Sequence, residues 1–324
     1  MRIVYKEMPE RRFGVELEVS PSITKNAIGK ILGKYEESTN GGHRVEVTSG
    51  KKGWAETRGN CYWHVKYDST CGHEGKGKDF GWEIASYIGS TYADLDRISK
   101  AADYLHKSGL QVNRNCGLHI HVEARDLGTT DMGCLLARWV NVEDILIKIC
   151  DPYRNNNKYC KRLHERWTQR SFWGAYHPEF PQQFWSDMKP TNLGTHDNAE
   201  KKYTLNTVGW AKGKCFSSYD CQTVELRLPE CLLKSEHILY WASLMINFVE
   251  GCKNSEPPPQ IAPARKLSEV LKLLNLQGRD DFFLLEPRLL DTKLWFLRKI
   301  VNSAQIDRDL AEEAVELIDF ITEI

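Results

Sequence analysis

The chain has 324 residues, which is long enough for one large domain or two modest ones. Its 44 basic and 44 acidic residues cancel, so no global field points to nucleic acid or to an anionic membrane as a partner. The longest apolar stretches, such as residues 238–249, are too short to span a bilayer. Ten dispersed cysteines, and a start without a secretory apolar stretch, favour a reducing cytoplasm.

The first predicted strand presents two carboxylates on one face. Between residues 15 and 20, apolar residues alternate with Glu16, Glu18 and a serine, which is the period of a half-buried strand. The segment 26–57 is polar and rich in glycine, and we expect only a short helix at 26–37 and a short strand at 44–48 there.

Two further strands and a helix follow. Residues 63–68 alternate in the same way and place Lys66 on the polar face, and extended structure resumes at 82–86 with Glu83. Residues 92–107 have the apolar period of an amphipathic helix, with Gly109 as its stop. This helix should cover the apolar face of the sheet.

The second half repeats the pattern of two-faced strands between helices. Residues 111–124 should form a strand, residues 130–150 a long helix, and 203–208 and 223–228 two further strands, followed by a helix at 235–252 and a mainly helical part to residue 324 that includes 292–302 and 307–321. We therefore predict one α+β domain over residues 1–324, with an antiparallel or mixed sheet and helices on one face.

Three separate strands carry pairs of ionisable residues on one face and apolar residues on the other. The pairs are Glu16 with Glu18, His119 with His121, and Glu225 with Arg227. A strand that faces water usually shows lysine, threonine, serine and glutamine instead. Carboxylates bind Mg²⁺ or Mn²⁺, imidazole suits Mn²⁺, and arginine offers a forked donor to phosphoryl oxygens.

Four motifs occur in the order and style of the amidoligase family. They are Phe13–Glu18 (FGVELE), Trp82–Ser86 (WEIAS), Asn115–Val122 (NCGLHIHV) and Thr223–Arg227 (TVELR). The chain thus resembles the amidoligases and, through them, the wider carboxylate-amine ligase superfamily of glutamine synthetase and glutamate-cysteine ligase. The motifs cover residues 11–232, and the helical part 235–324 carries none. Tyr87 departs from the family, which often has proline there.

The resemblance implies a curved, mainly antiparallel sheet of about six strands with helices behind it, as in the catalytic fold of glutamine synthetase. It also implies an ATP- and Mg²⁺- (or Mn²⁺-) dependent ligase that forms an amide or isopeptide bond through an acyl-phosphate. The substrates would be a small-molecule or peptide carboxylate and an amine, and nucleic acid would enter only as a modified-base substrate.

The same resemblance gives each motif residue a role. By it, the divalent ions would bind Glu16, Glu18 and Glu83, with His119 and Glu225 completing a second ion's shell. His121 would approach the nucleotide, and Arg227 would hold the transferred phosphate, so Arg227, Glu83 and Glu225 count as catalytic. Lys66 and Asn206 are secondary candidates for cofactor binding.

Other interpretations stay open. The chain could be a metal- or nucleotide-binding module of the same fold without turnover, or a Zn²⁺ hydrolase that uses His119 and His121. Three further patterns allow either a functional or an ordinary structural reading. They are a C-x₂-H and C-x-H set (Cys61, His64, Cys71, His73), a near P-loop that lacks its Ser/Thr (72–78) and a basic-aromatic stretch that could grip phosphates (153–173).

Overall fold

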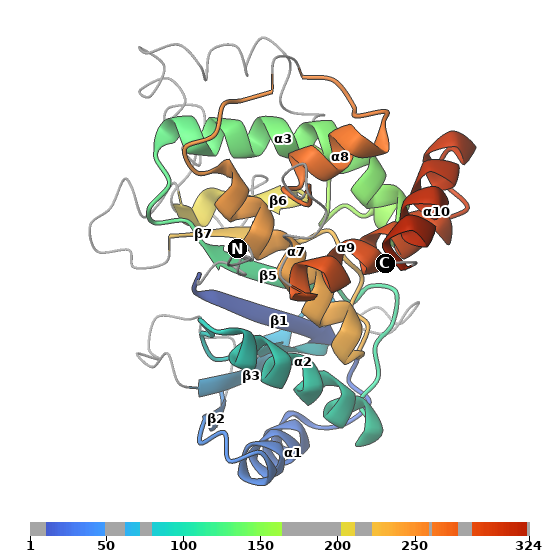
Figure 1. The fold of residues 1–324 in the computed structure, drawn as a ribbon. Coiled ribbons are helices and arrows are strands. Elements are labelled where there is room, and N and C mark those ends of the chain that lie inside the picture. Colours follow the sequence, from blue (N-terminus) through green and yellow to red (C-terminus); the bar gives the residue numbers. More distant parts are fainter. Residues whose placement is uncertain are drawn as a thin grey trace, which may run out of the picture. The chain divides into compact units, whose positions relative to one another are not determined.

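The computed structural model describes residues 11–48, 62–71, 80–163, 202–210, 222–258, 261–277 and 287–322. These residues form a mixed α+β fold (Figure 1). The strands are β1 (Phe13–Val19), β2 (Arg44–Val47), β3 (Tyr62–Asp68), β4 (Gly81–Ala85), β5 (Leu118–Glu123), β6 (Leu205–Asn206) and β7 (Thr223–Leu226). The helices are α1 (Lys25–Ser38), α2 (Tyr92–Lys107), α3 (Thr129–Lys148), the 3-10 helix η1 (Pro152–Asn156), α7 (Ser235–Cys252), α8 (Leu267–Leu273), α9 (Pro287–Val301) and α10 (Arg308–Thr322). Within the described ranges, no helix combines the length and the apolar character that crossing a membrane requires.

The chain divides into two compact units, which we call the N-terminal unit and the C-terminal unit. The N-terminal unit consists of Glu10–His121 and Pro229–Ala242, and the C-terminal unit contains Val122–Leu228 and Ser243–Ile324. Strand β5 and helix α7 each continue along the chain from one unit into the other. The single domain expected over residues 1–324 stays a prediction.

The strands of the N-terminal unit follow the order β2-β3-β4-β1-β5. Strand β4 pairs antiparallel with both β1 and β3, whereas β2 and β3 pair in parallel. In the C-terminal unit, β6 and β7 pair antiparallel. The mainly antiparallel character of the α+β fold is therefore confirmed, with seven strands described where about six were expected.

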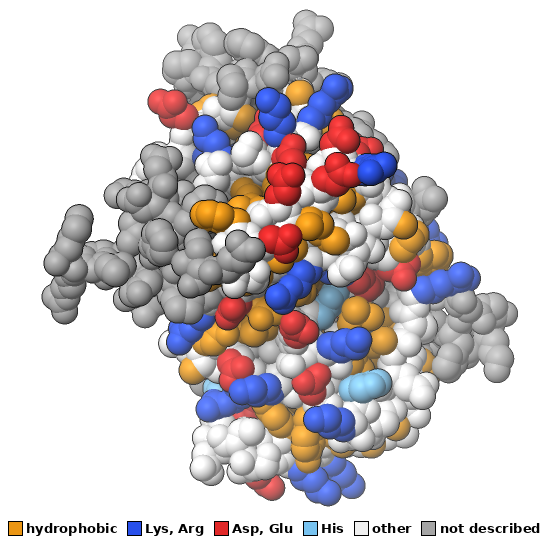
Figure 2. Space-filling model, turned by 45° about the vertical axis from the view of Figure 1, so that its right-hand side comes forward, with side chains coloured by type: hydrophobic (Ala, Val, Ile, Leu, Met, Phe, Trp, Pro, Cys, Tyr) orange, Lys and Arg blue, Asp and Glu red, His pale blue; other side chains and the backbone are white. Residues whose placement is uncertain are grey.

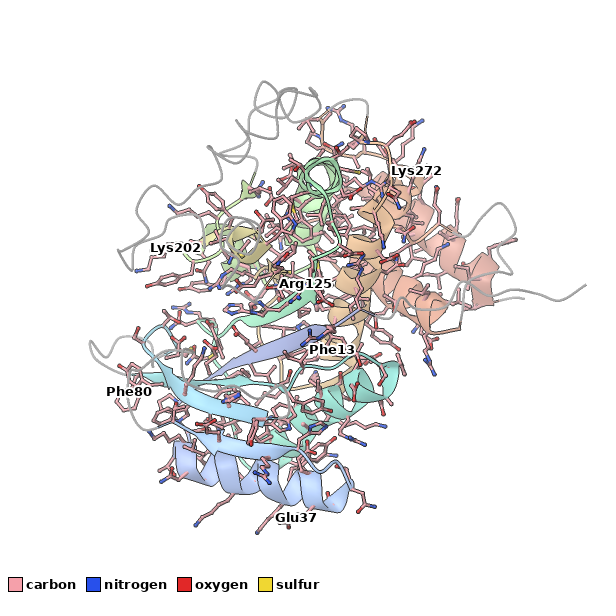
Figure 3. All side chains as sticks on the ribbon, turned by 90° about the vertical axis from the view of Figure 1, so that its left-hand side faces the viewer. Phe13, Glu37, Phe80, Arg125, Lys202 and Lys272 are labelled. Carbon is pink, nitrogen blue, oxygen red and sulfur yellow. The ribbon has the colours of Figure 1, made fainter. Side chains whose placement is uncertain are left out.

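The apolar residues of these strands form the core of the N-terminal unit. Leu17, Trp63, Val65 and Ile84 are at most 1% exposed. Helix α1 contacts β2, β3 and α2, and it runs along these strands up to the labelled Glu37 in Figure 3. Burial of one strand face against helices forces the alternating polar residues onto the opposite face, which is where the candidate site lies.

Helix α2 begins and ends as the sequence predicts. The Thr91 side chain accepts a hydrogen bond from the Asp94 amide at 3.1 Å, and the Asp94 carboxylate accepts the Thr91 amide at 3.0 Å, which together make a capping box. Gly109 follows the last turn with a φ of +94°, a conformation that other residues adopt only at a cost. Local residues alone therefore set both ends of this helix.

The C-terminal unit is built around α3, most of whose residues are buried. Trp139 of α3 packs edge-on against Phe248 of α7, with 5.6 Å between the ring centroids. Helix α3 also contacts α8 and η1, and α10 contacts both α8 and α9.

Charged side chains of both signs are interspersed on the surface drawn in Figure 2. This distribution agrees with the equal numbers of acidic and basic residues in the sequence.

Candidate active site

Two buried glutamates of β1 form the centre of the candidate site. Glu16 and Glu18 are only 7% and 6% exposed, although both point away from the apolar core. The strand period places them on one face because they are two residues apart. Buried carboxylates need strong partners, since an ionised group without them pays a large desolvation cost.

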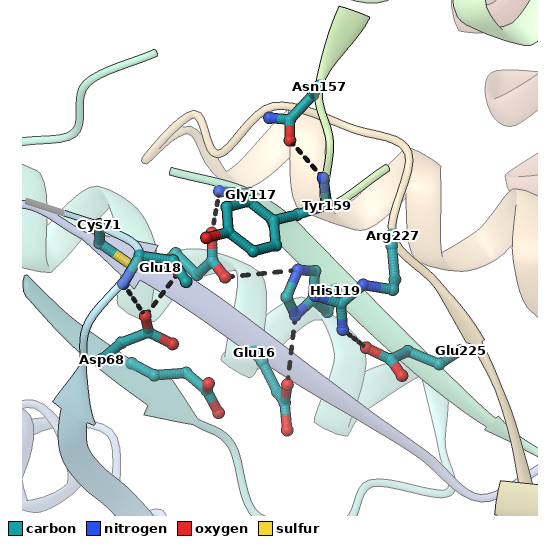
Figure 4. Close-up of polar contacts among 12 residues, drawn as sticks. Glu16, Glu18, Asp68, Cys71, Gly117, His119, Asn157, Tyr159, Glu225 and Arg227 are labelled. Carbon is teal, nitrogen blue, oxygen red and sulfur yellow. Dashed lines mark hydrogen bonds and ion pairs between the residues drawn. The ribbon is translucent and has the colours of Figure 1, made fainter. Parts of the chain in front are cut away.

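Two imidazoles from β5 supply part of that compensation. His119 approaches Glu16 with Nδ1 at 3.3 Å and Glu18 with Nε2 at 3.6 Å, so one ring lies between both carboxylates (Figure 4). His121 Nε2 lies 3.4 Å from the other oxygen of Glu16. The Gly117 amide donates a 2.6 Å hydrogen bond to Glu18. The motif on β5 thus contacts the motif on β1, as the sequence analysis expected.

A third carboxylate is paired with a lysine. The Lys66 ammonium on β3 lies 2.5 Å from Glu83 Oε1 on β4, and the two residues face each other in the antiparallel register. Glu83 also faces Glu18 in the register of β4 with β1. Lys66, Glu83 and Glu18 therefore form a lateral row across three strands, because directly paired residues lie on the same face of a sheet.

The pKa values of Glu16 and Glu83 are shifted in opposite directions. Burial raises the pKa of Glu16, but the charge of His121 and hydrogen bonds from both histidines outweigh burial and hold this pKa well below its usual range. Burial raises the pKa of Glu83 well above its usual range, the charge of Glu16 adds to the rise, and Lys66 offsets it only in part. The ionised form is thus favoured at Glu16 and disfavoured at Glu83.

A second group beside Glu18 was missed as a unit by sequence reasoning. Single ligand atoms of Glu18, Asp68 and Cys71 lie within 4.8 Å of one another. Asp68 ends β3 on its polar face, and its carboxylate accepts hydrogen bonds from the Thr70 amide and hydroxyl, each at 2.5 Å. The alternation of β3 indicates the face of Asp68, but only the turn after the strand brings Cys71 back toward Glu18.

Two members of the cysteine and histidine pattern around β3, His64 and Cys71, lie among the described residues, and they have different neighbours. His64 pairs with Glu46 of β2 at 3.5 Å, whereas Cys71 belongs to the Glu18 group. His64 pairs with Ala85 of β4, whereas Cys71 lies beside Gly81 at the other end of that strand, about 13 Å away and too far for one ion to be shared. The other two members, Cys61 and His73, lie outside the described residues, as do the near P-loop 72–78 and residues 164–173 of the basic-aromatic stretch.

The remaining predicted residues lie in the C-terminal unit. Asn206 of β6 faces Glu225 of β7 and donates a 2.5 Å hydrogen bond to its carboxylate. Arg227 forms an ion pair with the other oxygen of Glu225. Glu225 is 7% exposed, so this pair is a partly desolvated one. A guanidinium that is held in place by a carboxylate can donate hydrogen bonds to an anionic oxygen through its fork of N–H groups.

Arg154 has a structural role that sequence reasoning did not assign. Its guanidinium donates to the carbonyl oxygen of Leu228 at 2.9 Å and to that of Arg227 at 2.6 Å, and the residue is 4% exposed. Arg154 therefore supports the end of β7. The basic-aromatic stretch suggested an arginine that binds phosphate or faces solvent. Neither interpretation predicts an arginine that donates hydrogen bonds to main-chain carbonyls.

A buried network connects α3 to β6 in the same unit. Glu143, which is fully buried, accepts a 2.7 Å hydrogen bond from the Leu163 amide and another from the Thr204 hydroxyl. The Thr204 hydroxyl in turn accepts the Trp139 indole N–H at 3.0 Å. The Thr204 carbonyl accepts the Arg227 amide at 2.9 Å. This network holds the backbone beside Asn206 and Arg227.

Divalent ions suit the donor set of the N-terminal unit. Glu16, Glu18 and His119 converge while buried, and hard carboxylate oxygens with one imidazole are a donor set that Mn²⁺ and Mg²⁺ accept. Their convergence would be costly for the carboxylates alone, since like charges at short distance oppose each other's ionisation.

The fold and its polar strand face define an α+β protein with a carboxylate-rich site. Residues 9–249 match the family described as "Putative amidoligase enzyme", and the chain belongs to this family. Its activity is therefore of the ligase type.

Solved structures and curated proteins provide two further comparisons. A solved structure described as apo GmaS without ligand is 12% identical, with 98% of this chain and 70% of that chain covered and a TM-score of 0.31. No curated protein matches the chain.

Proposed function

We propose that the protein is an ATP- and Mg²⁺- (or Mn²⁺-) dependent ligase that joins a carboxylate to an amine through an acyl-phosphate. The observation that carries this proposal is the buried contact of Glu16 and Glu18 with His119, in a chain that belongs to an amidoligase family. Amide formation is the reaction that this family name implies, and it needs activation of the acid.

The chemistry explains why carboxylates and cations belong together in such a site. A carboxylate oxygen of the substrate attacks the γ-phosphorus of ATP, the bond to the bridging oxygen breaks, and ADP leaves. The amine then attacks the acyl carbon, loses a proton, and inorganic phosphate leaves. Bound divalent ions would supply charge neutralisation for the phosphoryl oxygens, which is the main catalytic need of such transfers.

Each described group has a role in this scheme. Glu16, Glu18 and His119 would hold a divalent ion, and His121 would approach the nucleotide. In the C-terminal unit, Arg227 would bind a phosphoryl oxygen through its guanidinium, with Glu225 orienting it through their ion pair. Asn206 would fix the carboxylate of Glu225 through its 2.5 Å hydrogen bond.

The test is to trap the activated acid. The full chain is incubated with ATP, Mg²⁺, hydroxylamine and single members of a panel of amino acids, peptides and polycarboxylates, and both hydroxamate and ADP are measured. We expect at least one acid to give equal amounts of both. Hydroxamate without ADP, or ADP whose rate does not depend on the acid, would contradict the proposal.

A glutamate-to-glutamine pair provides the matched control. Glu18→Gln keeps the shape of the side chain but removes a charge at the proposed ion, so hydroxamate formation should fall by about 100-fold or more. Glu37→Gln makes the same change on the exposed end of α1 and should leave the rate within about twofold.

Two other outcomes would identify other functions. ATP binding without ADP formation for any acid and amine would indicate a binding module of the same fold. One zinc ion per chain, with hydrolysis that needs no ATP, would indicate a hydrolase that uses His119 and His121.

A further inference from the structure

Lys66 places a fixed positive charge within the row of carboxylates on the N-terminal unit's sheet. The row runs Lys66, Glu83, Glu18 across β3, β4 and β1, one residue from each strand in direct register. The Lys66 side chain is 23% exposed and that of Glu83 is 10% exposed, so the ion pair is largely removed from water. A pair with this burial and a 2.5 Å separation is much less screened than a surface salt bridge.

We propose that the Lys66 ammonium occupies the cation position at Glu83, so that divalent ions bind at Glu16, Glu18 and His119 and not at Glu83. This inference rests on the proposed function, because it assumes that the carboxylate row binds divalent ions. It removes Glu83 from the metal ligands that the family resemblance implies. It also gives Lys66 a role in setting the number of metal ions bound, instead of a role in binding the nucleotide.

The distribution of charged partners among the three glutamates supports this division. Glu16, Glu18 and Glu83 bring three negative charges when ionised, and Lys66 neutralises one of them at short range. Glu16 and Glu18 are the two carboxylates that share His119, whereas Glu83 has Lys66 opposite it.

The sheet geometry makes the lysine difficult to displace. Lys66 and Glu83 are backbone partners in the register of β3 with β4, so their side chains meet without crossing another strand. An ion that bound Glu83 would have to enter beside an ammonium of like charge or drive that ammonium out into water. Mg²⁺ also gives up its own water reluctantly, which makes such an exchange less favourable still.

The number of ions bound by the full chain tests this inference without any assay of activity. Free Mn²⁺ is followed by electron paramagnetic resonance during titration of the wild type, Lys66→Met, Lys66→Arg and Lys66→Met/Glu83→Gln, with circular dichroism of each. We expect Lys66→Met to bind one more Mn²⁺ per chain than the wild type. Lys66→Arg, which keeps the charge, and the double variant, which removes the vacated carboxylate, should bind the wild-type number.

Equal Mn²⁺ numbers in the wild type and Lys66→Met would overturn the inference. If Lys66→Met does not fold, the single variant Glu83→Gln decides. It should keep the wild-type number of ions, and the loss of one ion from it would show that Glu83 is a ligand.

Measurements of ADP and of bound Mn²⁺ together distinguish a failure of this inference from a failure of the proposed function. If the ligase proposal alone is wrong, the chain forms no ADP with any acid while the Mn²⁺ pattern of the variants is as expected. If the inference alone is wrong, the chain forms ADP and hydroxamate while the number of bound ions does not respond to Lys66. No Mn²⁺ bound by any variant would overturn the inference and the metal dependence together.

Discussion

At the scale of single residues, Glu16 is a buried carboxylate whose ionised form is favoured by the histidines around it. Its pKa lies well below 4.5 in the folded metal-free chain, despite the opposing effect of burial, because His121 and His119 stabilise the charge. A depressed carboxyl pKa contributes stability above its unfolded value, and this contribution is lost as the pH falls toward the folded value.

Glu16→Gln should therefore make the free energy of unfolding depend less steeply on pH under acid conditions. In metal-free protein with EDTA, the wild type should lose unfolding free energy more steeply than Glu16→Gln below about pH 4.5. Urea unfolding between pH 3 and pH 6 measures this difference, and Glu37→Gln on exposed α1 should follow the wild type. Parallel profiles for the wild type and Glu16→Gln would contradict the assignment.

Lys293 is a buried lysine of α9 whose pKa is also lowered, which for a lysine destabilises the fold. It is 2% exposed, and burial lowers its pKa from 10.5 to about 8. Below pH 8 the buried ammonium lowers the free energy of unfolding, and this destabilisation disappears as the pH rises from 8 toward 10.5.

Lys293→Met should raise the free energy of unfolding at pH 7, on the order of 1–3 kcal/mol. The gain should shrink when urea unfolding is repeated near pH 10, where the wild-type lysine is neutral in the folded state. Lys272→Met, an exposed lysine of α8, should change little at either pH. A destabilised Lys293→Met at pH 7 would show that the ammonium stabilises the fold.

At the scale of elements, the network of Glu143, Thr204 and Trp139 connects α3 to the segment that carries β6. Thr204→Val keeps the volume of the side chain but removes the donor to the fully buried Glu143 and the acceptor for the Trp139 indole. A buried group deprived of its partner costs about 1–3 kcal/mol.

We expect Thr204→Val to lower the free energy of unfolding by about that amount. Chemical denaturation followed by tryptophan fluorescence measures it. Thr130→Val, the same change at an exposed position of α3, should have an effect below about 0.5 kcal/mol. Equal stabilities of the two variants would show that the network adds nothing to the fold.

The elements with local signals were predictable from sequence. Helices α1, α2 and α7 occupy the expected ranges to within about a residue, because their apolar period is local, and Thr24 and Thr91 cap α1 and α2 at their own first turns. Strand β6 is shorter than the expected 203–208, since only Leu205 and Asn206 pair with β7. The preceding Thr204 points its hydroxyl at Glu143, a contact with a residue 61 positions away that no local pattern contains.

Strand pairing was beyond the sequence pattern. Alternation showed that Lys66 and Glu83 lie on polar faces, but the register that sets them opposite each other depends on tertiary packing. The parallel pairing of β2 with β3 was likewise not predictable, because the alternation of the four residues of β2 indicates their faces but not the direction in which the strand pairs. Glu16, Glu18, His119 and His121 were predicted as one group, and the structure brings these four together.

At the scale of the whole molecule, the proposed activity is activation of an acid by transfer of a phosphoryl group to it. Family membership gives the ligase class, and the carboxylate row gives a place for the cations that such a transfer needs. The route through an acyl-phosphate predicts a specific fate for one oxygen atom. The substrate carboxylate that attacks ATP loses one oxygen to the departing phosphate.

The most direct measurement follows that oxygen. An acid that gives hydroxamate is labelled with ¹⁸O in both carboxylate oxygens and is joined to the amine by the full chain with ATP and Mg²⁺. Mass spectrometry of the products should find one ¹⁸O in each inorganic phosphate and one in the amide. Unlabelled phosphate, or label in AMP, would contradict the account.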